Sequence, residues 1–197
     1  MLFAYWDGIR GDRAAPERSD VKPGHIRHIL ADTFVLAREE TGEAVFRLSG
    51  TRCEALFGQD LKGVPFTTLF PAAEREGASR LTDTVARETI GLVAGLTGLT
   101  DAGTSVALEL LLLPLRHGGR TDSRLIGALS TRTLPSWIGL FPVTRLEVGS
   151  LRIVHASDDP IGVPPEPASG PAERRRRFVV HQGGRERATI SIEQPIV

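Results

Sequence analysis

Cysteine is almost missing from this sequence, since Cys53 is the only one in 197 residues. A single thiol excludes an intrachain disulfide framework and a structural zinc site built from several thiolates. An excess of one charge is missing as well, because 24 Lys and Arg residues balance 24 Asp and Glu residues. A neutral chain has no overall field that would attract nucleic acid or an acidic membrane surface. The single thiol fits the reducing cytosol, and we predict a cytoplasmic location.

Long hydrophobic runs are also absent. The apolar start MLFAYW has no basic region before it and is interrupted by Asp7 and Arg10. It is therefore too short for a signal peptide or a transmembrane helix. Hydrophobic residues still make up 41% of the chain, which is sufficient for a folded core. We predict a folded domain with extensions and no membrane span.

The common catalytic signatures do not occur. The sequence has no Gly-x-Ser-x-Gly elbow, no phosphate-binding glycine loop that ends in Lys-Ser or Lys-Thr, and no His-Glu-x-x-His pair. Asp158 and Asp159 are adjacent acids in a proline-rich tail, where nothing would hold them at a reacting centre. His25 and His28 have no acidic residue or cysteine placed to complete a metal site with them. We therefore predict neither an enzyme nor a metal protein.

Residues 1–31 are predicted to form a helical cap and a linker. Leu2, Trp6 and Ile9 fall on one face of a helix, which predicts a short amphipathic helix at the start of the chain. The polar stretch 13–23 contains two prolines and is typical of a linker.

Helix signals cluster in the next part of the chain. Thr51 and Glu54 have the spacing of a capping box, which predicts a helix that starts near Arg52. Gly58 can take the left-handed conformation that ends such a helix. Proline suits the first turn of a helix, so a longer helix is predicted from Pro71 to Glu88.

Strand signals lie on both sides of these helices. The alternating segments Thr33 to Leu36 and Ala44 to Gly50 predict a hairpin. A period of two returns in a strand after Gly91, in Val106 to Leu115 and in a third strand after Gly119. Two strands, then helices, then three strands predict an α+β domain in which helices pack on one face of an antiparallel sheet.

The stretch Ala55 to Arg75, ALFGQDLKGVPFTTLFPAAER, resembles the middle of a PAS domain. The match is most specific from Leu56 to Pro71, which contains a phenylalanine-glycine turn, a second glycine, a buried phenylalanine and a proline. The resemblance covers roughly Asp32 to Arg132. It implies a PAS-like core at 32–132 with a five-stranded antiparallel sheet and helices on one face.

A narrower resemblance concerns both ends of this core. The chain is similar to small stand-alone bacterial PAS proteins whose first helix looks like FAYWDGIRG and whose sheet ends in a tryptophan-containing extension. Here that extension is Ser136 to Val143, SWIGLFPV, within a C-terminal segment at 133–155.

The resemblance implies a space between sheet and helices where PAS domains hold cofactors. Large leucine and phenylalanine side chains can either fill such a space or line a cavity for a small apolar ligand, and Arg52 and Thr97 are the candidate polar groups in it. Haem is not expected, because Pro71 to Glu88 contains no histidine ligand. A flavin is not expected either, because the asparagine and glutamine partners of a flavin-reactive cysteine are missing around Cys53. The residues predicted to surround the space are Phe34, Phe46, Leu48, Phe57, Phe66, Leu69, Leu92, Leu96, Leu108, Leu110 and Leu112.

The opposite face of the sheet is predicted to be covered too. Leu108, Leu110 and Leu112 should face the helices, which leaves Leu111 and Leu113 on the other side, where a solvated sheet carries polar residues. The N-terminal helix is the expected cover, either from the same chain or from a second copy, and we favour a homodimer. The predicted interface consists of Leu2, Phe3, Tyr5, Trp6, Ile9, Leu111, Leu113 and Trp137.

The composition changes at residue 156. Six of the 13 prolines lie between Pro160 and Pro195, which predicts a flexible tail at 156–197. The cationic run Arg174 to Arg177 lies in this tail. We interpret the whole chain as a non-enzymatic PAS signalling adaptor or sensor that binds other signalling proteins. The alternative is a nucleic-acid-associated regulator that uses the arginine-rich tail.

Overall fold

The computed structural model describes residues 1–154 and the two-residue strand at 180–181. The predicted tail at 156–197, including Arg174 to Arg177, otherwise lies outside the described residues. The nucleic-acid alternative, which depends on that tail, therefore stays a prediction.

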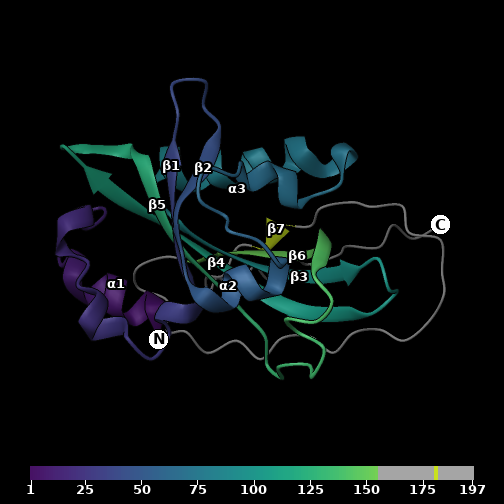
Figure 1. The fold of residues 1–197 in the computed structure, drawn as a ribbon. Helices are drawn as coiled ribbons and strands as arrows, with labels where there is room; N and C mark the ends of the chain where they lie inside the picture. Colours follow the sequence, from purple (N-terminus) through teal and green to yellow (C-terminus); the bar gives the residue numbers. More distant parts are fainter. Residues whose placement is uncertain (155–179, 182–197) are drawn as a thin grey trace, which may run out of the picture.

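One mainly antiparallel sheet forms the centre of the described structure (Figure 1). All the predicted strands form, and they lie side by side in the order β2-β1-β5-β4-β3. The α+β class and the PAS-like sheet are thus confirmed. The strands are β1 (Thr33–Arg38), β2 (Ala44–Ser49), β3 (Gly91–Thr100), β4 (Ser105–His117) and β5 (Arg120–Ser130).

The sheet continues beyond β3, which the sequence did not predict. β6 (Val143–Val154) pairs antiparallel with β3 along its whole length, and β7 (Val180–His181) pairs parallel with the end of β6. The predicted extension at 133–155 therefore contains a strand of the same sheet, β6. Among the described residues the sheet has seven strands.

Three α-helices accompany the sheet in the described part of the chain: α1 (Leu2–Arg10), α2 (Thr51–Phe57) and α3 (Arg75–Glu88). The helix predicted from Pro71 begins as the 3₁₀ turn η5 (Ala72–Glu74) and becomes α-helical only at Arg75. Four short 3₁₀ segments fill the remaining loops: η1 (Arg18–Asp20), η2 (Pro23–Ile26), η3 (Leu30–Asp32) and η4 (Phe66–Leu69).

The start of α2 differs from the prediction. The capping box of Thr51 and Glu54 does not form, because Gly50 is the N-cap residue and no side chain caps the helix. A Cβ at Gly50 would lie 2.3 Å from the carbonyl oxygen of Ala31, so only glycine fits there. The Glu54 carboxylate instead accepts a hydrogen bond from the Ser49 hydroxyl (2.5 Å). The end of α2 is as predicted, since Gly58 ends it with a left-handed φ of 65°.

Each face of the sheet is covered. We call the face that packs on α2 and α3 the inner face, and the face that packs on α1 the outer face (Figure 1). Strand β4 divides between them as predicted: Leu108, Leu110 and Leu112 pack in the inner core, whereas Leu111 and Leu113 pack in the outer one. The alternation holds because successive side chains of a strand point to opposite faces.

Leu48 does not line the inner space, and this prediction was wrong. The β1–β2 register pairs Leu36 with Phe46 but Val35 with Leu48, so Arg47 is an extra residue in a β-bulge. A bulge moves every later side chain of the strand to the opposite face. Leu48 consequently lies on the outer face, where its side chain is 53% exposed.

Candidate functional site

The inner space is filled by phenylalanine rings. Phe34 and Phe46 lie 5.2 Å apart between ring centroids, Phe46 and Phe66 lie 6.2 Å apart, and Phe66 and Phe70 lie 5.4 Å apart. These separations are within the range of favourable aromatic pairs. Phe70 was not among the predicted residues, although it belongs to the same cluster. The predicted residues that do face this core are Phe34, Phe46, Phe57, Phe66, Leu69, Leu92, Leu96, Leu108, Leu110 and Leu112.

The void left among these side chains measures about 10 Å³. That is about the space of one water molecule. Its lining includes Leu61, Leu129 and Leu146, which sequence reasoning did not single out. A larger apolar ligand would therefore have to displace side chains that are packed at core density.

The candidate polar groups do not reach this space. The Arg52 guanidinium donates two hydrogen bonds to the Asp32 carboxylate, at 2.6 and 2.7 Å, and this pairing raises its pKa above the ordinary value. Thr97 is exposed on β3. Both side chains therefore lie at the surface and do not line the inner space.

Cys53 is a buried residue of α2. Its thiol donates a hydrogen bond to the Asp32 backbone carbonyl (3.3 Å). Burial disfavours the thiolate and raises the pKa of the thiol to about 12. Since the thiolate is the reactive form, the native thiol is chemically protected.

We therefore expect Cys53 to react slowly with iodoacetamide in the folded protein. An ordinary thiol has a pKa of about 8.5, so the native thiolate population near neutral pH is lower on the order of a thousandfold. Mass spectrometry of alkylation with time, in buffer and in concentrated urea, measures the difference. The rate in buffer should rise steeply as the pH approaches 12. Equal rates in buffer and urea would contradict the buried position.

The outer face is covered by the helix of the same chain. Leu2, Phe3 and Trp6 are buried against the outer core, and the Trp6 indole N–H donates a hydrogen bond to the Pro114 carbonyl (2.7 Å). Of the two predicted covers, a helix of the same chain or one of a second copy, the structure has the first, and the homodimer itself stays a prediction. These apolar side chains already bury their surface within one chain.

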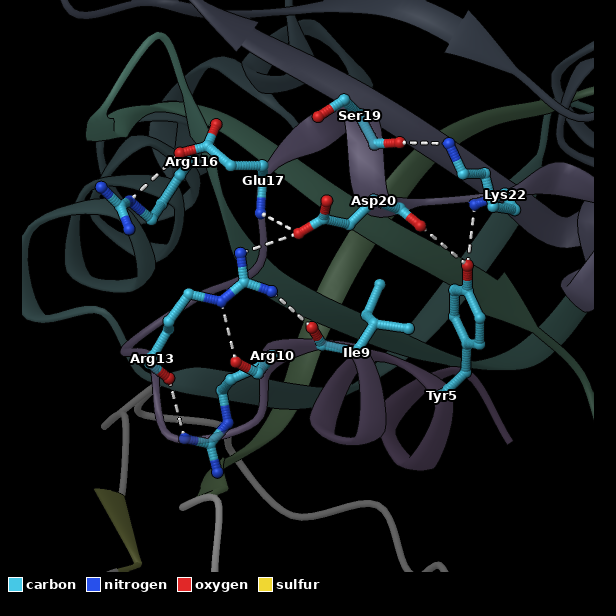
Figure 2. A network of polar contacts seen from close by, with 9 residues as sticks. All are labelled: Tyr5, Ile9, Arg10, Arg13, Glu17, Ser19, Asp20, Lys22 and Arg116. Carbon is cyan, nitrogen blue, oxygen red and sulfur yellow. Dashed lines mark hydrogen bonds and ion pairs between the residues drawn. The ribbon is translucent and has the colours of Figure 1, made fainter.

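A polar network ties the segment after α1 to the sheet (Figure 2). The Arg13 guanidinium pairs with the Asp20 carboxylate (2.9 Å), which lowers the pKa of that carboxyl. Arg116 on β4 pairs with Glu17 (3.3 Å), and its backbone N–H donates to the Pro16 carbonyl (2.8 Å). The linker predicted at 13–23 is therefore attached to the end of β4.

Tyr5 and Ile9 lie beside this network. The Tyr5 hydroxyl accepts a hydrogen bond from the Lys22 backbone N–H (2.7 Å), and the Ile9 carbonyl accepts one from Arg13 (2.6 Å) (Figure 2). Both side chains are partly buried in the outer core. The predicted interface residues on α1 thus face their own sheet and linker.

The connection between β5 and β6, residues 131–142, exposes apolar side chains. Trp137 and Ile138 pack on the inner core, while Leu134, Leu140 and Phe141 are 59%, 74% and 47% exposed. We call these three exposed residues the connection patch. The sequence of this segment predicted a role for Trp137, but it does not distinguish the buried side chains from the exposed ones.

The described residues contain neither a grouped metal site nor a membrane-spanning helix. Within 1–154 and 180–181, no three His, Cys, Asp or Glu side chains are grouped to hold a metal ion, and His25 and His28 are exposed. No helix in the same ranges is both long and apolar enough to span a bilayer.

The sequence comparisons agree with the fold. A sequence model of the PAS domain matches residues 1–130, which is more than half of the chain. The chain therefore belongs to the PAS domain family, whose members are signalling and sensor modules. The match includes the N-terminal helix, whereas the narrower likeness to proteins that begin with FAYWDGIRG stays a prediction. No curated protein matches the chain.

Solved structures with a similar fold have low sequence identity. A PAS domain from Colwellia psychrerythraea is 15% identical with a TM-score of 0.40, over 57% of this chain and 98% of its own. The light-state LOV domain of the blue-light photoreceptor Aureochrome1 is 10% identical with a TM-score of 0.43, over 59% and 91%. The Vibrio cholerae VqmA dimer is 15% identical with a TM-score of 0.38, over 60% and 55%.

Proposed function

We propose that this chain is a non-enzymatic PAS signalling adaptor or sensor that acts by binding other proteins. The observation that carries the proposal is the connection patch, Leu134, Leu140 and Phe141, which exposes three large apolar side chains within eight positions. Contiguous exposed apolar side chains mark interaction sites more often than single ones do, and the short sequence separation of these three favours a common surface. The filled inner core supports the same view, because it leaves protein contact as the main route of signalling.

The connection patch is mechanically joined to the core. Trp137 packs on the inner core directly between Leu134 and Leu140 in the sequence. The connection also touches the end of α2, since a Cβ at Gly58 would lie 2.9 Å from the Cβ of Pro142. A change in inner-core packing would therefore shift the populations of surface conformations that a partner selects.

We propose other signalling proteins as partners, with a second copy of the chain among them, in the cytoplasm. The homodimer stays part of the proposal, but its contact would use the connection patch and the exposed part of Trp137. The α1 residues are not offered for this role, because Leu2, Phe3 and Trp6 are buried in their own chain.

Charged substitutions test the role of the connection patch. We expect the double variant Leu140→Asp, Phe141→Asp to weaken partner binding or self-association by at least about tenfold, because central apolar contacts dominate interface energies. Its stability should change by no more than about 0.5 kcal/mol, since both side chains are exposed. Sedimentation velocity measures self-association, and affinity capture with a purified partner measures heterologous binding.

Leu48→Asp is the matched control, because Leu48 is an exposed leucine elsewhere on the sheet. The proposal expects this variant to bind like the unmodified chain. Equal binding by the double variant and by Leu48→Asp would contradict the proposal that the connection patch contacts the partner.

A further inference from the structure

A groove beside the inner core lies between α3 and strands β3 and β6. Its volume is about 220 Å³, and we call it the α3–β6 groove. This is much larger than the void of about 10 Å³ among the phenylalanine rings. The groove is lined by Gly77, Arg80, Leu81 and Thr84 of α3, Leu92 of β3, and Leu151, Arg152 and Ile153 of β6.

Gly77 is unusual at its position in α3. Glycine inside a helix costs about 1 kcal/mol relative to alanine, so this residue weakens the helix that carries it. Gly77, Leu81 and Thr84 are spaced by four and three positions, which places them on one side of the helix above the groove. Gly77 lines the groove and places no side chain in it.

The floor of the groove is apolar. Leu81 and Leu92 are buried, and Leu151 and Ile153 are half-buried. Register pairs Leu92 with Ile153 and Ala94 with Leu151, so both β6 side chains share the inner face with α3. Such a surface favours an aliphatic or aromatic ligand body.

Arg80 supplies the polar group at the rim. Its guanidinium pairs with Glu76 at 2.7 Å, but the two side chains are 64% and 82% exposed. An exposed pair of this kind is worth only about 0–1 kcal/mol, so a ligand carboxylate can exchange with Glu76. Arg152 also lines the groove, but its register partner Val93 packs against the outer core. Strand alternation therefore directs the Arg152 side chain to the outer face, and we do not assign it the role of Arg80.

We propose that the α3–β6 groove binds a small aliphatic carboxylate. Its alkyl chain would lie on Leu81, Leu92, Leu151 and Ile153, and its carboxylate would pair with Arg80. The volume is below the usual range for drug-sized ligands, so a short or medium chain fits better than a long one. The inference goes beyond the proposed function, since it concerns a small molecule and not a protein partner.

Calorimetric titration of the full chain with octanoate and with octanol tests this site. We expect both probes to bind, and we expect Gly77→Leu to weaken both by at least about tenfold, because a side chain placed in the groove competes with the alkyl chain. The same substitution should raise the stability of the helix, since leucine is a better helix former than glycine. Lost binding in this variant would therefore not result from unfolding.

Arg80→Gln separates the head group from the alkyl chain. We expect it to weaken octanoate binding by about two- to fivefold and to leave octanol binding unchanged, because only the carboxylate pairs with the guanidinium. Arg87→Gln is the matched control, since Arg87 is exposed on the same helix and does not line the groove. It should bind both probes like the unmodified chain.

Methyl chemical shifts locate the bound probe. Octanoate should shift the methyl signals of Leu81, Leu151 and Ile153 and leave those of Leu113 and Leu115 on the outer face unchanged. The proposal is overturned by the absence of octanoate binding, by unchanged binding in Gly77→Leu, or by shifts confined to the outer face. None of these results affects the test of the connection patch, which uses different residues and a protein partner.

Discussion

Replacement of Trp6 by alanine is expected to lower the free energy of unfolding by about 3–5 kcal/mol, the usual cost of truncating a large buried aromatic side chain. Trp6 is only 3% exposed and packs in the outer core with Leu113 and Leu115. The substitution also leaves the Pro114 carbonyl without the indole N–H that donates to it at 2.7 Å. A loss of this size is a large fraction of the stability of a single domain.

Trp6→Phe separates the two contributions. It keeps one buried aromatic ring, and it removes the indole N–H together with a smaller part of the buried surface, so we expect a loss of about 1–3 kcal/mol. Urea unfolding followed by circular dichroism measures both variants. A loss below about 1 kcal/mol for Trp6→Ala would show that α1 does not unfold cooperatively with the sheet. It would then favour the alternative in which the helix of a second copy covers the outer face.

The strands of the PAS-like core were predictable because their side chains alternate regularly. Leu108 to Leu113 gave the correct face for each leucine, and this required nothing more than a period of two. The same rule gave the wrong face for Leu48, because the extra residue Arg47 in the bulge reverses the alternation after it. A bulge depends on pairing with β1, which the sequence of β2 alone does not contain.

β6 was not predicted because its sequence, VTRLEVGSLRIV, mixes charged residues and glycine with apolar ones. Its strand conformation follows from long-range pairing with β3, and tertiary context of this kind overrides local propensity. The missed strand also hid the α3–β6 groove, whose floor needs Leu151 and Ile153 beside α3.

The inner core shows a second limit of the sequence. Its composition predicted which residues meet, and ten of the eleven predicted residues do face the helices. Composition did not predict how much space they leave, because a void of about 10 Å³ results from the particular rotamers of many side chains. Volume, and with it the choice between a filled core and a ligand cavity, is a property of three-dimensional packing.

Phe66 is the residue on which this choice depends most directly. Its ring lies within 6.5 Å of the ring centroids of Phe34, Phe46 and Phe70, and it is only 2% exposed. We expect Phe66→Ala to lower the free energy of unfolding by about 3–5 kcal/mol, because it combines lost burial with a cavity. Urea unfolding measures the loss. Leu140→Ala is the control, since Leu140 is 74% exposed and should change stability by no more than about 0.5 kcal/mol.

The same variant tests whether the inner space is capable of holding a ligand at all. A dry apolar cavity of sufficient size binds benzene or xenon, and a ligand that binds only the folded state raises the midpoint of unfolding. We therefore expect benzene to stabilise Phe66→Ala and to leave the unmodified chain unchanged. If benzene stabilises both proteins equally, the inner core is looser than its packing indicates, and the small apolar ligand belongs there after all. If it stabilises only the variant, one phenylalanine ring closes the site where PAS domains hold cofactors, and ligands must act from the surface.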